Sequence, residues 1–199
     1  MIKAILFDMD GVLIDSYEAW FKLFNFTLKK YGFKEINKKE FDEKVWAQDF
    51  ATVTTKFFKG KDVKEISKFY FSNFMNFTEY LKKMKNVEFV LKELNKRGLK
   101  TAVVTNTYNE IATELLRGVG LYDYFDLVLG GDDVEKGKPF PDMVLLACKK
   151  LDIANKDSVL VGDTRWDMIT AEKAGAKFVA YKFDGSKRID DLKELMELV

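Results

Sequence analysis

Histidine is absent from the 199 residues of this sequence. Its absence excludes Ser-His-Asp and Cys-His catalysis, zinc held by imidazole, and a histidine general base. Any chemistry must therefore use Asp, Glu, Lys, Ser or Thr side chains. The sequence has a single cysteine, Cys148, which excludes an internal disulfide. We therefore expect a reducing compartment, the cytoplasm.

Other scarcities exclude further classes of protein. The 33 basic and 32 acidic residues leave a net charge of +1, so no charge surplus favours nucleic acid or an anionic membrane surface. No stretch reaches the roughly 18 uncharged apolar residues that a membrane span needs. The chain also enters a strand-like segment directly after Met1-Ile2-Lys3, which is not typical of a cleavable signal. We expect no nucleic-acid partner and no membrane partner, and the sequence does not indicate an oligomeric state.

Short apolar runs alternate with amphipathic stretches over most of the chain. The apolar runs cover residues 3–7, 99–105, 125–129, 158–161 and 177–181. Runs of this length and composition are typical of buried parallel strands. Helical patterns cover residues 87–96, 110–119, 142–150, 167–174 and 190–198. This alternation predicts an α/β fold with a doubly wound parallel sheet.

Residues 15 to about 80 interrupt this alternation. They contain 18 of the 29 aromatic residues and no convincing strand pattern. Helical spacings run through Trp20, Phe24, Leu28 and Tyr31, and through Ile66, Tyr70, Phe74 and Phe77. We interpret the segment as a helical insertion whose aromatic side chains form its own core. A second interpretation, that a few of these rings line a substrate cleft, stays open.

Polar side chains follow four of the predicted strands. They are Asp8 and Asp10, Thr105, Lys138, and Asp163 with Asp167. Structural alternatives remain. Asp163 and Asp167 could serve a helix N-terminus, Thr105 could be an ordinary strand-end hydroxyl, and Lys138 could be a solvated loop cation. Ligands of doubly wound sheets bind beyond the carboxyl ends of the strands. All six residues in this order therefore indicate a functional site at that edge.

The charges of this set indicate a metal. The four carboxylates would repel one another strongly, because one lysine offsets only one of their four negative charges, and a divalent cation would relieve this repulsion. Without histidine or a nearby cysteine the ligands are all oxygen, which favours Mg²⁺ over zinc or copper. A carboxylic acid that keeps its proton beside these charges could protonate a leaving oxygen.

The same segments resemble the four signature motifs of the haloacid dehalogenase-like hydrolase superfamily. The motifs are Phe7-Asp8-Met9-Asp10-Gly11-Val12-Leu13-Ile14-Asp15-Ser16, Val104-Thr105-Asn106, Gly137-Lys138-Pro139 with Pro141-Asp142, and Val161-Gly162-Asp163-Thr164 with Asp167 and Ala174-Gly175. The resemblance covers essentially the whole chain and is closest in character to phosphoglycolate phosphatase-like and β-phosphoglucomutase-like members. It implies a Rossmann-like core, residues 1–14 and 82–199, and an inserted all-helical cap, residues 15–81. Such a cap would close over the site and select the substrate.

The resemblance also implies roles for the site residues. Asp8 would attack phosphorus and form an aspartyl-phosphate, and Asp10 would protonate the leaving alcohol and then deprotonate water. Mg²⁺ would be held by the carboxylates of Asp8 and Asp163 and by the backbone carbonyl of Asp10. Asp167 would orient Lys138 or a metal-bound water.

The phosphate-binding residues implied by the resemblance are Thr105, Asn106 and Lys138. Backbone amides of Met9, Asp10 and Asn106 would join the Thr105 hydroxyl in holding the phosphoryl oxygens. The implied activity is Mg²⁺-dependent hydrolysis of a small phosphate monoester, such as phosphoglycolate or a sugar phosphate. The partner expected is therefore a small phosphorylated metabolite.

Other activities remain as alternatives. Haloacid dehalogenases and phosphonate hydrolases lack the second aspartate of the first motif, so Asp10 favours phosphatase chemistry. A β-phosphoglucomutase-like phosphotransferase resembles the first motif closely but uses a cap histidine, which this sequence lacks. A non-catalytic phosphate-binding protein of the same fold would be expected to have lost Asp8, Asp10 or Lys138. The substrate itself is not indicated by residues 15–80.

Overall fold

The structure is a computed structural model that describes residues 1–46, 48 and 50–199. These residues form two compact units. One contains residues 1–15 and 82–199, and the other, the inserted unit, contains residues 16–81. Among the described residues, no helix is both long and apolar enough to span a membrane.

The first unit is built on a six-stranded sheet in the order β5-β4-β1-β6-β7-β8, with every neighbouring pair parallel. Its strands are β1 (Ala4–Phe7), β4 (Lys100–Val104), β5 (Leu127–Leu129), β6 (Ser158–Gly162), β7 (Lys177–Tyr181) and β8 (Arg188–Ile189). The predicted α/β fold with a doubly wound parallel sheet is confirmed. The five predicted strands are found within two residues of their predicted ends, and the two-residue β8 was not predicted.

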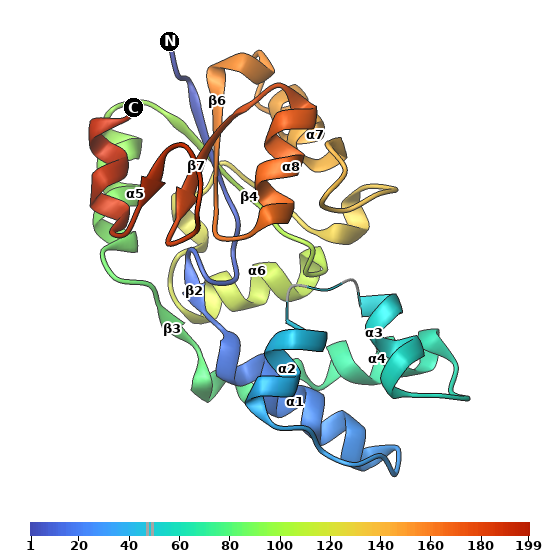
Figure 1. Cartoon of the computed structure of the whole chain (residues 1–199). Helices are drawn as coiled ribbons and strands as arrows, with labels where there is room; N and C mark the ends of the chain where they lie inside the picture. The colour runs from blue at the N-terminus through green and yellow to red at the C-terminus, as the bar shows by residue number, and fades with distance from the viewer. Residues whose placement is uncertain (47, 49) are drawn as a thin grey trace. The chain divides into compact units, whose positions relative to one another are not determined.

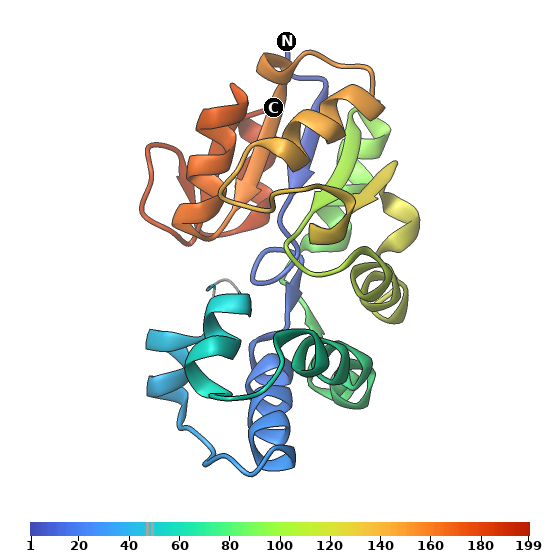
Figure 2. The same cartoon turned by 90° about the vertical axis from the view of Figure 1, so that its right-hand side faces the viewer.

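Helices cover both faces of this sheet. They are α5 (Val87–Lys96), α6 (Asn109–Gly118), α7 (Asp142–Lys150) and α8 (Arg165–Ala174), with short 3-10 turns η2 (Tyr122–Tyr124), η3 (Gly131–Asp133), η4 (Asn155–Asp157) and η5 (Leu192–Glu197). Figures 1 and 2 show α5 and η5 on one face and α7 and α8 on the other. The predicted α-helix over 190–198 is wrong in type, because this last segment closes i to i+3 bonds such as Glu194 N–H to Asp191 O.

The core explains why these segments become strands and helices. All four residues of β1 are fully buried, as a central strand covered on both faces requires. Leu6 of β1 packs with Val104, Leu160, and the small residues Ala147 and Ala171 that let α7 and α8 approach the sheet. Burial of this apolar surface drives the association of sheet and helices.

Strand register brings three chain segments to one edge of the sheet. Phe7, the last residue of β1, is opposite Val103 of β4 and Val161 of β6. The loops that follow these three strands therefore leave the sheet side by side. These loops begin at Asp8, Thr105 and Asp163, which are three of the predicted site residues.

The chain leaves and re-enters the first unit through a small antiparallel pair. Strand β2 (Ile14–Asp15) pairs with β3 (Lys82–Lys83), with Asp15 opposite Lys82. Met84 N–H extends this pairing by a hydrogen bond of 3.0 Å to Leu13 O. The two ends of the inserted unit are therefore held next to each other.

The described part of the inserted unit is helical. It contains α1 (Tyr17–Lys30), α2 (Lys38–Lys44), α3 (Phe50–Phe57), α4 (Val63–Ser72) and the 3-10 segment η1 (Phe74–Tyr80). Its core is aromatic, since Trp20 of α1 stacks on Tyr70 and contacts Phe74 at a ring separation of 4.0 Å. The helical spacing noted through Ile66, Tyr70, Phe74 and Phe77 spans two elements, because Asn73 ends α4 and η1 follows.

Candidate active site

The loop after β1 carries two of the predicted aspartates. The ladder continues one residue beyond β1, since Asp8 N–H donates to Val161 O at 2.9 Å. The turn then depends on Gly11, whose φ is +83°. A Cβ at Gly11 would lie 2.1 Å from Asp163 Oδ2, so only glycine lets this backbone approach the Asp163 carboxylate so closely.

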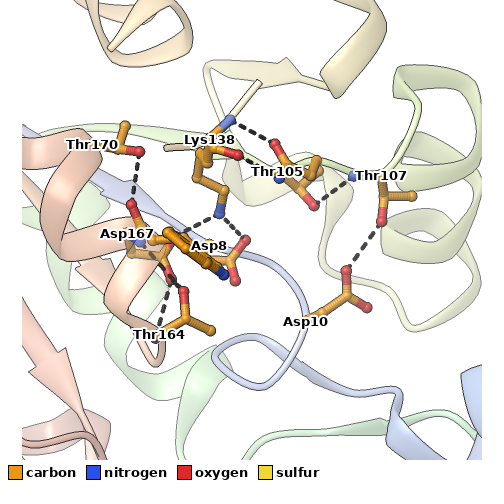
Figure 3. A network of polar contacts seen from close by, with 10 residues as sticks. Asp8, Asp10, Thr105, Thr107, Lys138, Thr164, Asp167 and Thr170 are labelled. Carbon is orange, nitrogen blue, oxygen red and sulfur yellow. Dashed lines mark hydrogen bonds and ion pairs between the residues drawn. The ribbon is translucent and has the colours of Figure 1, made fainter. Parts of the chain in front are cut away.

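Lys138 lies between two buried carboxylates. Its Nζ is 2.6 Å from Asp8 Oδ1 and 2.6 Å from Asp167 Oδ1 (Figure 3). The side chain of Lys138 is 6% exposed and that of Asp167 is fully buried. Charge-assisted hydrogen bonds in such a setting fix the position of the ammonium group.

The backbone of Lys138 is held by the side chain of Asn106. Lys138 N–H donates to Asn106 Oδ1 at 2.8 Å, and Asn106 Nδ2 donates to Lys138 O at 3.1 Å. A Cβ at the neighbouring Gly137 would lie 2.6 Å from Asn106 Oδ1, so the glycine makes room for this pair of bonds. We call these two bonds the Asn106 clamp. They join the loop after β4 to the loop that carries Lys138.

Asp167 is fixed at the first turn of α8. Thr164 is the N-cap residue of this helix and forms a capping box with Asp167. Both the N–H and the hydroxyl of Thr164 donate to Asp167 Oδ2. Each carboxylate oxygen of Asp167 therefore has a hydrogen-bond partner, Lys138 on Oδ1 and Thr164 on Oδ2. A Cβ at Gly162 would lie 2.3 Å from the Asp167 Cβ, so this packing also depends on a glycine.

Three carboxylates converge beside Lys138. Ligand oxygens of Asp8, Asp163 and Asp167 all lie within 4.8 Å of one another. Among the described residues, Asp163 Oδ1 is a buried oxygen with no hydrogen-bond partner. Leaving a buried carboxylate oxygen unpaired is costly, so this atom fits the ligand of a cation. The all-oxygen set of donors fits Mg²⁺.

Burial and mutual repulsion change the acidity of this group. Burial raises the pKa of Asp8 well above its ordinary value, and the neighbouring carboxylates raise it further although Lys138 opposes the shift. Burial likewise raises the pKa of Asp163 to about 7, with Asp167 adding to the effect. Burial alone would lower the pKa of Lys138, but Asp167 and Asp8 outweigh burial and raise it. The lysine stays charged, while Asp8 and Asp163 retain a proton more readily than ordinary carboxylates.

Asp10 is not one of the three residues whose ligand oxygens lie within 4.8 Å of one another, although its charge also raises the pKa of Asp8 and of Asp163. Its Oδ2 accepts a hydrogen bond of 3.1 Å from the hydroxyl of Thr107 (Figure 3). Thr107 N–H in turn donates to Thr105 Oγ1 at 3.1 Å. The carboxylates of Asp8 and Asp10 thus differ in burial and in partner, since Asp8 is buried and bonded to Lys138 whereas Asp10 is partly exposed and bonded to a hydroxyl.

The structure brings the predicted residues to one edge of the first unit. Asp8, Lys138, Asp163 and Asp167 form one cluster, while Asp10 and Thr105 are linked through Thr107. Sequence reasoning missed the contacts of Thr107 and Thr164. Thr164 had a detectable signal, because a threonine three residues before an acidic residue is typical of a capping box. Thr107 had none beyond its place next to Thr105-Asn106.

Comparisons with known proteins agree with this architecture. A protein of Caldanaerobacter subterraneus subsp. tengcongensis named "Putative pyrophosphatase PpaX" is 34% identical over 92% of this chain and 82% of that protein. A phosphoglycolate phosphatase of Neisseria meningitidis is 31% identical over 92% of this chain and 81% of that protein. The crystal structure of a haloacid dehalogenase-superfamily hydrolase of subfamily IA from Geobacter sulfurreducens is 25% identical, with a TM-score of 0.78 over 99% of this chain and 96% of that chain.

The family comparison covers nearly the whole molecule. The sequence profile described as haloacid dehalogenase-like hydrolase matches residues 5–181, from the first strand of the sheet to the end of β7. This match spans the strand ends that carry Asp8, Thr105 and Asp163, as well as the loop that carries Lys138. The resemblance inferred from the four motifs is thereby confirmed, and the chain is an enzyme of the haloacid dehalogenase-like hydrolase family.

Proposed function

We propose that this protein is a Mg²⁺-dependent phosphatase that hydrolyses a small phosphate monoester through an aspartyl-phosphate on Asp8. The observation that carries the proposal is the buried cluster in which Lys138 joins Asp8 and Asp167 beside Asp163. Phosphoryl transfer depends mainly on positioning and on stabilisation of negative charge. This cluster supplies both.

Asp8 is the proposed nucleophile. One of its carboxylate oxygens forms a bond to phosphorus as the bond from phosphorus to the leaving oxygen breaks. Lys138, held 2.6 Å from Asp8 Oδ1, keeps its positive charge next to the reacting group throughout. Asp167 positions this ammonium group, because its two carboxylate oxygens are already bonded to Lys138 and Thr164.

Asp10 is the proposed acid and base. It gives a proton to the leaving alcohol oxygen in the first step and takes one from the attacking water in the second. That water forms a bond to phosphorus while the Asp8–phosphorus bond breaks, which releases phosphate and restores Asp8. The partly exposed position of Asp10 beside Thr107 supports a role separate from that of the buried nucleophile.

The residues that would hold Mg²⁺ are the carboxylates of Asp8 and Asp163 and the backbone carbonyl of Asp10. The unpaired Asp163 Oδ1 and the close approach of the Gly11 backbone to Asp163 support this set. When bound, the ion would neutralise negative charge on the phosphoryl group and on the nucleophile. The phosphoryl oxygens would be held by the Thr105 hydroxyl and by backbone amides of Met9, Asp10 and Asn106.

The substrate class is proposed from the relatives and from the inserted unit. Relatives are named phosphoglycolate phosphatase and pyrophosphatase, so phosphoglycolate, a sugar phosphate and pyrophosphate are the first compounds to test. We propose that the inserted unit acts as the cap that selects among them. A free thiol, Cys148, and the absence of any other cysteine fit a reducing compartment such as the cytoplasm.

The test is phosphate release across a panel of these substrates and 4-nitrophenyl phosphate, with Mg²⁺ and with EDTA. We expect turnover that EDTA abolishes and added Mg²⁺ restores. Undiminished turnover in EDTA would refute the metal assignment. A β-phosphoglucomutase-like phosphotransferase would convert one sugar phosphate into its isomer without net phosphate release, and a non-catalytic protein would bind phosphate without turnover.

A further inference from the structure

Thr107 is held rigidly at the start of the loop that follows β4. Its N–H donates to Thr105 Oγ1 at 3.1 Å, and its carbonyl accepts a hydrogen bond of 3.0 Å from Gly131 N–H. The hydroxyl then reaches Asp10 Oδ2, 97 positions earlier in the chain, at 3.1 Å (Figure 3). Thr107 is only 8% exposed, so water competes little for this bond.

We propose that Thr107 is a positioning residue that aims the carboxyl group of Asp10 for proton transfer. The inference rests on the proposed function, in which Asp10 is the general acid and base. A carboxyl group rotates readily about the bond that joins it to Cβ, and a general acid must point at the leaving oxygen to be effective. The Thr107 hydroxyl supplies a fixed anchor because its own backbone is bonded on both sides.

The bond is compatible with both protonation states of Asp10. A hydroxyl donates to Oδ2 whether that oxygen belongs to a carboxylate or is the carbonyl oxygen of a carboxylic acid. In the acid form this bond leaves the transferable proton on Oδ1. That proton moves to the leaving oxygen as the phosphorus–oxygen bond breaks, and Oδ1 later receives the proton of the attacking water.

Thr107 therefore contacts two groups that act on opposite sides of the breaking bond, at the phosphoryl group and at the leaving oxygen. Thr107 N–H bonds Thr105 Oγ1, and accepting this bond leaves the Thr105 hydroxyl its own proton to donate to a phosphoryl oxygen. Thr107 Oγ1 bonds Asp10, which serves the leaving oxygen. The backbone bonds do not involve the Thr107 side chain, so a side-chain substitution removes only the link to Asp10.

The test compares Thr107→Val with Thr107→Ser on two substrates. The best alkyl phosphate of the panel has a poor leaving group that needs protonation, whereas 4-nitrophenyl phosphate has a good one. We expect Thr107→Val, which replaces the hydroxyl by a methyl group, to lower kcat for the alkyl phosphate by roughly 10-fold, a fraction of the roughly 10²- to 10⁴-fold effect of a general acid. The kcat for 4-nitrophenyl phosphate should change much less, and KM should change little for either substrate. Thr107→Ser keeps the hydroxyl and should therefore restore the wild-type ratio of the two kcat values.

Two further variants separate positioning from a general structural effect. Thr170→Val is a matched control, because Thr170 is a fully buried threonine whose hydroxyl donates to Trp166 O at 2.8 Å and has no bond to Asp10. Any change in kcat that Thr170→Val causes should be the same for both substrates. In the double variant Asp10→Asn with Thr107→Val, the second substitution should lower kcat for the alkyl phosphate little further, since both substitutions act through one carboxyl group.

The outcomes distinguish this inference from the proposed function. If Thr107→Val lowers kcat equally for both substrates, or not at all, the inference is overturned. The proposed function still stands in that case if Asp10→Asn lowers kcat selectively for the alkyl phosphate. Equal losses for Asp10→Asn itself would overturn the acid role of Asp10, and the inference with it. Circular dichroism checks that each variant is folded. If Thr107→Val does not fold, Thr107→Ala removes the same bond and carries the same expectations.

Discussion

At the scale of single residues, Lys138 balances charges that would otherwise oppose folding. Three buried or half-buried carboxylates surround one ammonium group, so the cluster carries two excess negative charges when all are ionised. Burial of unbalanced charge is unfavourable, which is why the pKa of Asp8 and that of Asp163 are raised. Without a cation the site is a source of instability, and this instability should depend on pH.

We predict that the metal-free protein loses stability as the pH rises from about 4 to about 7. Folding raises the pKa of Asp163 from 3.8 to about 7, so in this interval the folded state holds a proton that the unfolded chain has released. The contribution of such a group to the free energy of unfolding falls with rising pH. Urea unfolding in EDTA at pH 5 and pH 8 measures this change.

Asp163→Asn is the variant that isolates this effect. It should flatten the pH dependence in EDTA and make the protein more stable than wild type at pH 8. Added Mg²⁺ should stabilise the wild type at pH 8 and the variant much less, because binding to the folded state alone raises the free energy of unfolding. If stability depends on pH in Asp163→Asn as it does in the wild type, the Asp163 carboxyl group is not the cause of the pH dependence.

Asp8→Asn should abolish turnover and leave the protein folded. An amide does not attack phosphorus, but its oxygen can still accept the hydrogen bond from Lys138. We expect kcat to fall by roughly 10⁴-fold or more, the scale seen when a nucleophile is removed. Asp123→Asn removes the same charge from an exposed position away from the site and should keep wild-type activity. Phosphate release and circular dichroism measure both effects, and substantial turnover by Asp8→Asn would show that another group attacks phosphorus.

The sequence predicted the residues of the site better than their contacts. Asp8, Thr105 and Asp163 follow apolar runs directly, so their place at one edge followed from the order of strands. The bonds of Thr107 to Asp10 and of Asn106 to Lys138 join loops that are 97 and 32 positions apart. Such side-chain contacts depend on the loop conformations, which no local pattern of residues encodes.

At the scale of elements, the site depends on hydrogen bonds between the loops that follow the strands. The Asn106 clamp ties the loop after β4 to the loop that precedes α7, and the capping box of α8 holds Asp167. The loops pack closely at Gly137 and at Gly162, so the spacing between them has little tolerance.

Gly137→Ala should impair the site without unfolding the protein. The added Cβ would lie 2.6 Å from Asn106 Oδ1, the end of a flexible side chain that can move aside and thereby break the Asn106 clamp. We expect kcat/KM to fall by roughly 10-fold, the scale of one lost hydrogen bond to a group that must stay in place. Gly118→Ala in α6 is the matched control, because a Cβ there meets nothing within 4 Å.

The control should keep wild-type kinetics and gain stability by up to about 1 kcal/mol, because alanine is favoured over glycine in a helix. Thermal unfolding and steady-state kinetics of both variants test these expectations. Equal kinetics for Gly137→Ala and wild type would mean that the Asn106 clamp does not control the position of Lys138.

Elements with long patterns were predicted well and very short ones were not. Strands β1, β4, β6 and β7 each contain at least three consecutive apolar residues, and the amphipathic period of α5 and α7 led to their observed bounds. Strands β2, β3 and β8 have two residues each, too few for any period to be visible. The change from α4 to η1 was also hidden, because a 3-10 segment places apolar residues at nearly the same spacing as an α-helix.

At the scale of the whole molecule, every proposed catalytic and binding residue belongs to the first unit. The first unit also contains the complete six-stranded sheet and the helices that cover it. The aromatic core of the inserted unit is formed by its own residues. Each unit therefore has the apolar interior that independent folding requires.

Replacing residues 16–81 by a short Gly/Ser linker should leave a folded first unit. Asp15 and Lys82 are paired partners of β2 and β3, so a hairpin-sized linker can join them. If the inserted unit is the substrate-selecting cap, kcat/KM for the best small substrate should fall by roughly 10²-fold, as when reacting groups lose their alignment. The kcat/KM for 4-nitrophenyl phosphate should fall much less. Equal losses, with the fold confirmed by circular dichroism, would assign substrate selection to the loops of the first unit.

The β2–β3 pair also bears on the order in which the chain folds. Strand β1 is synthesised first and lies at the centre of the sheet, but its partners β4 and β6 come about 100 and 150 residues later. Closing a loop of this length has an entropic cost that an already folded insertion reduces, because its two ends are then adjacent. The helices of residues 16–81 have local contacts and can form early. Early folding of the inserted unit would then favour the pairing of β4 with β1, because it shortens the loop that this pairing must close.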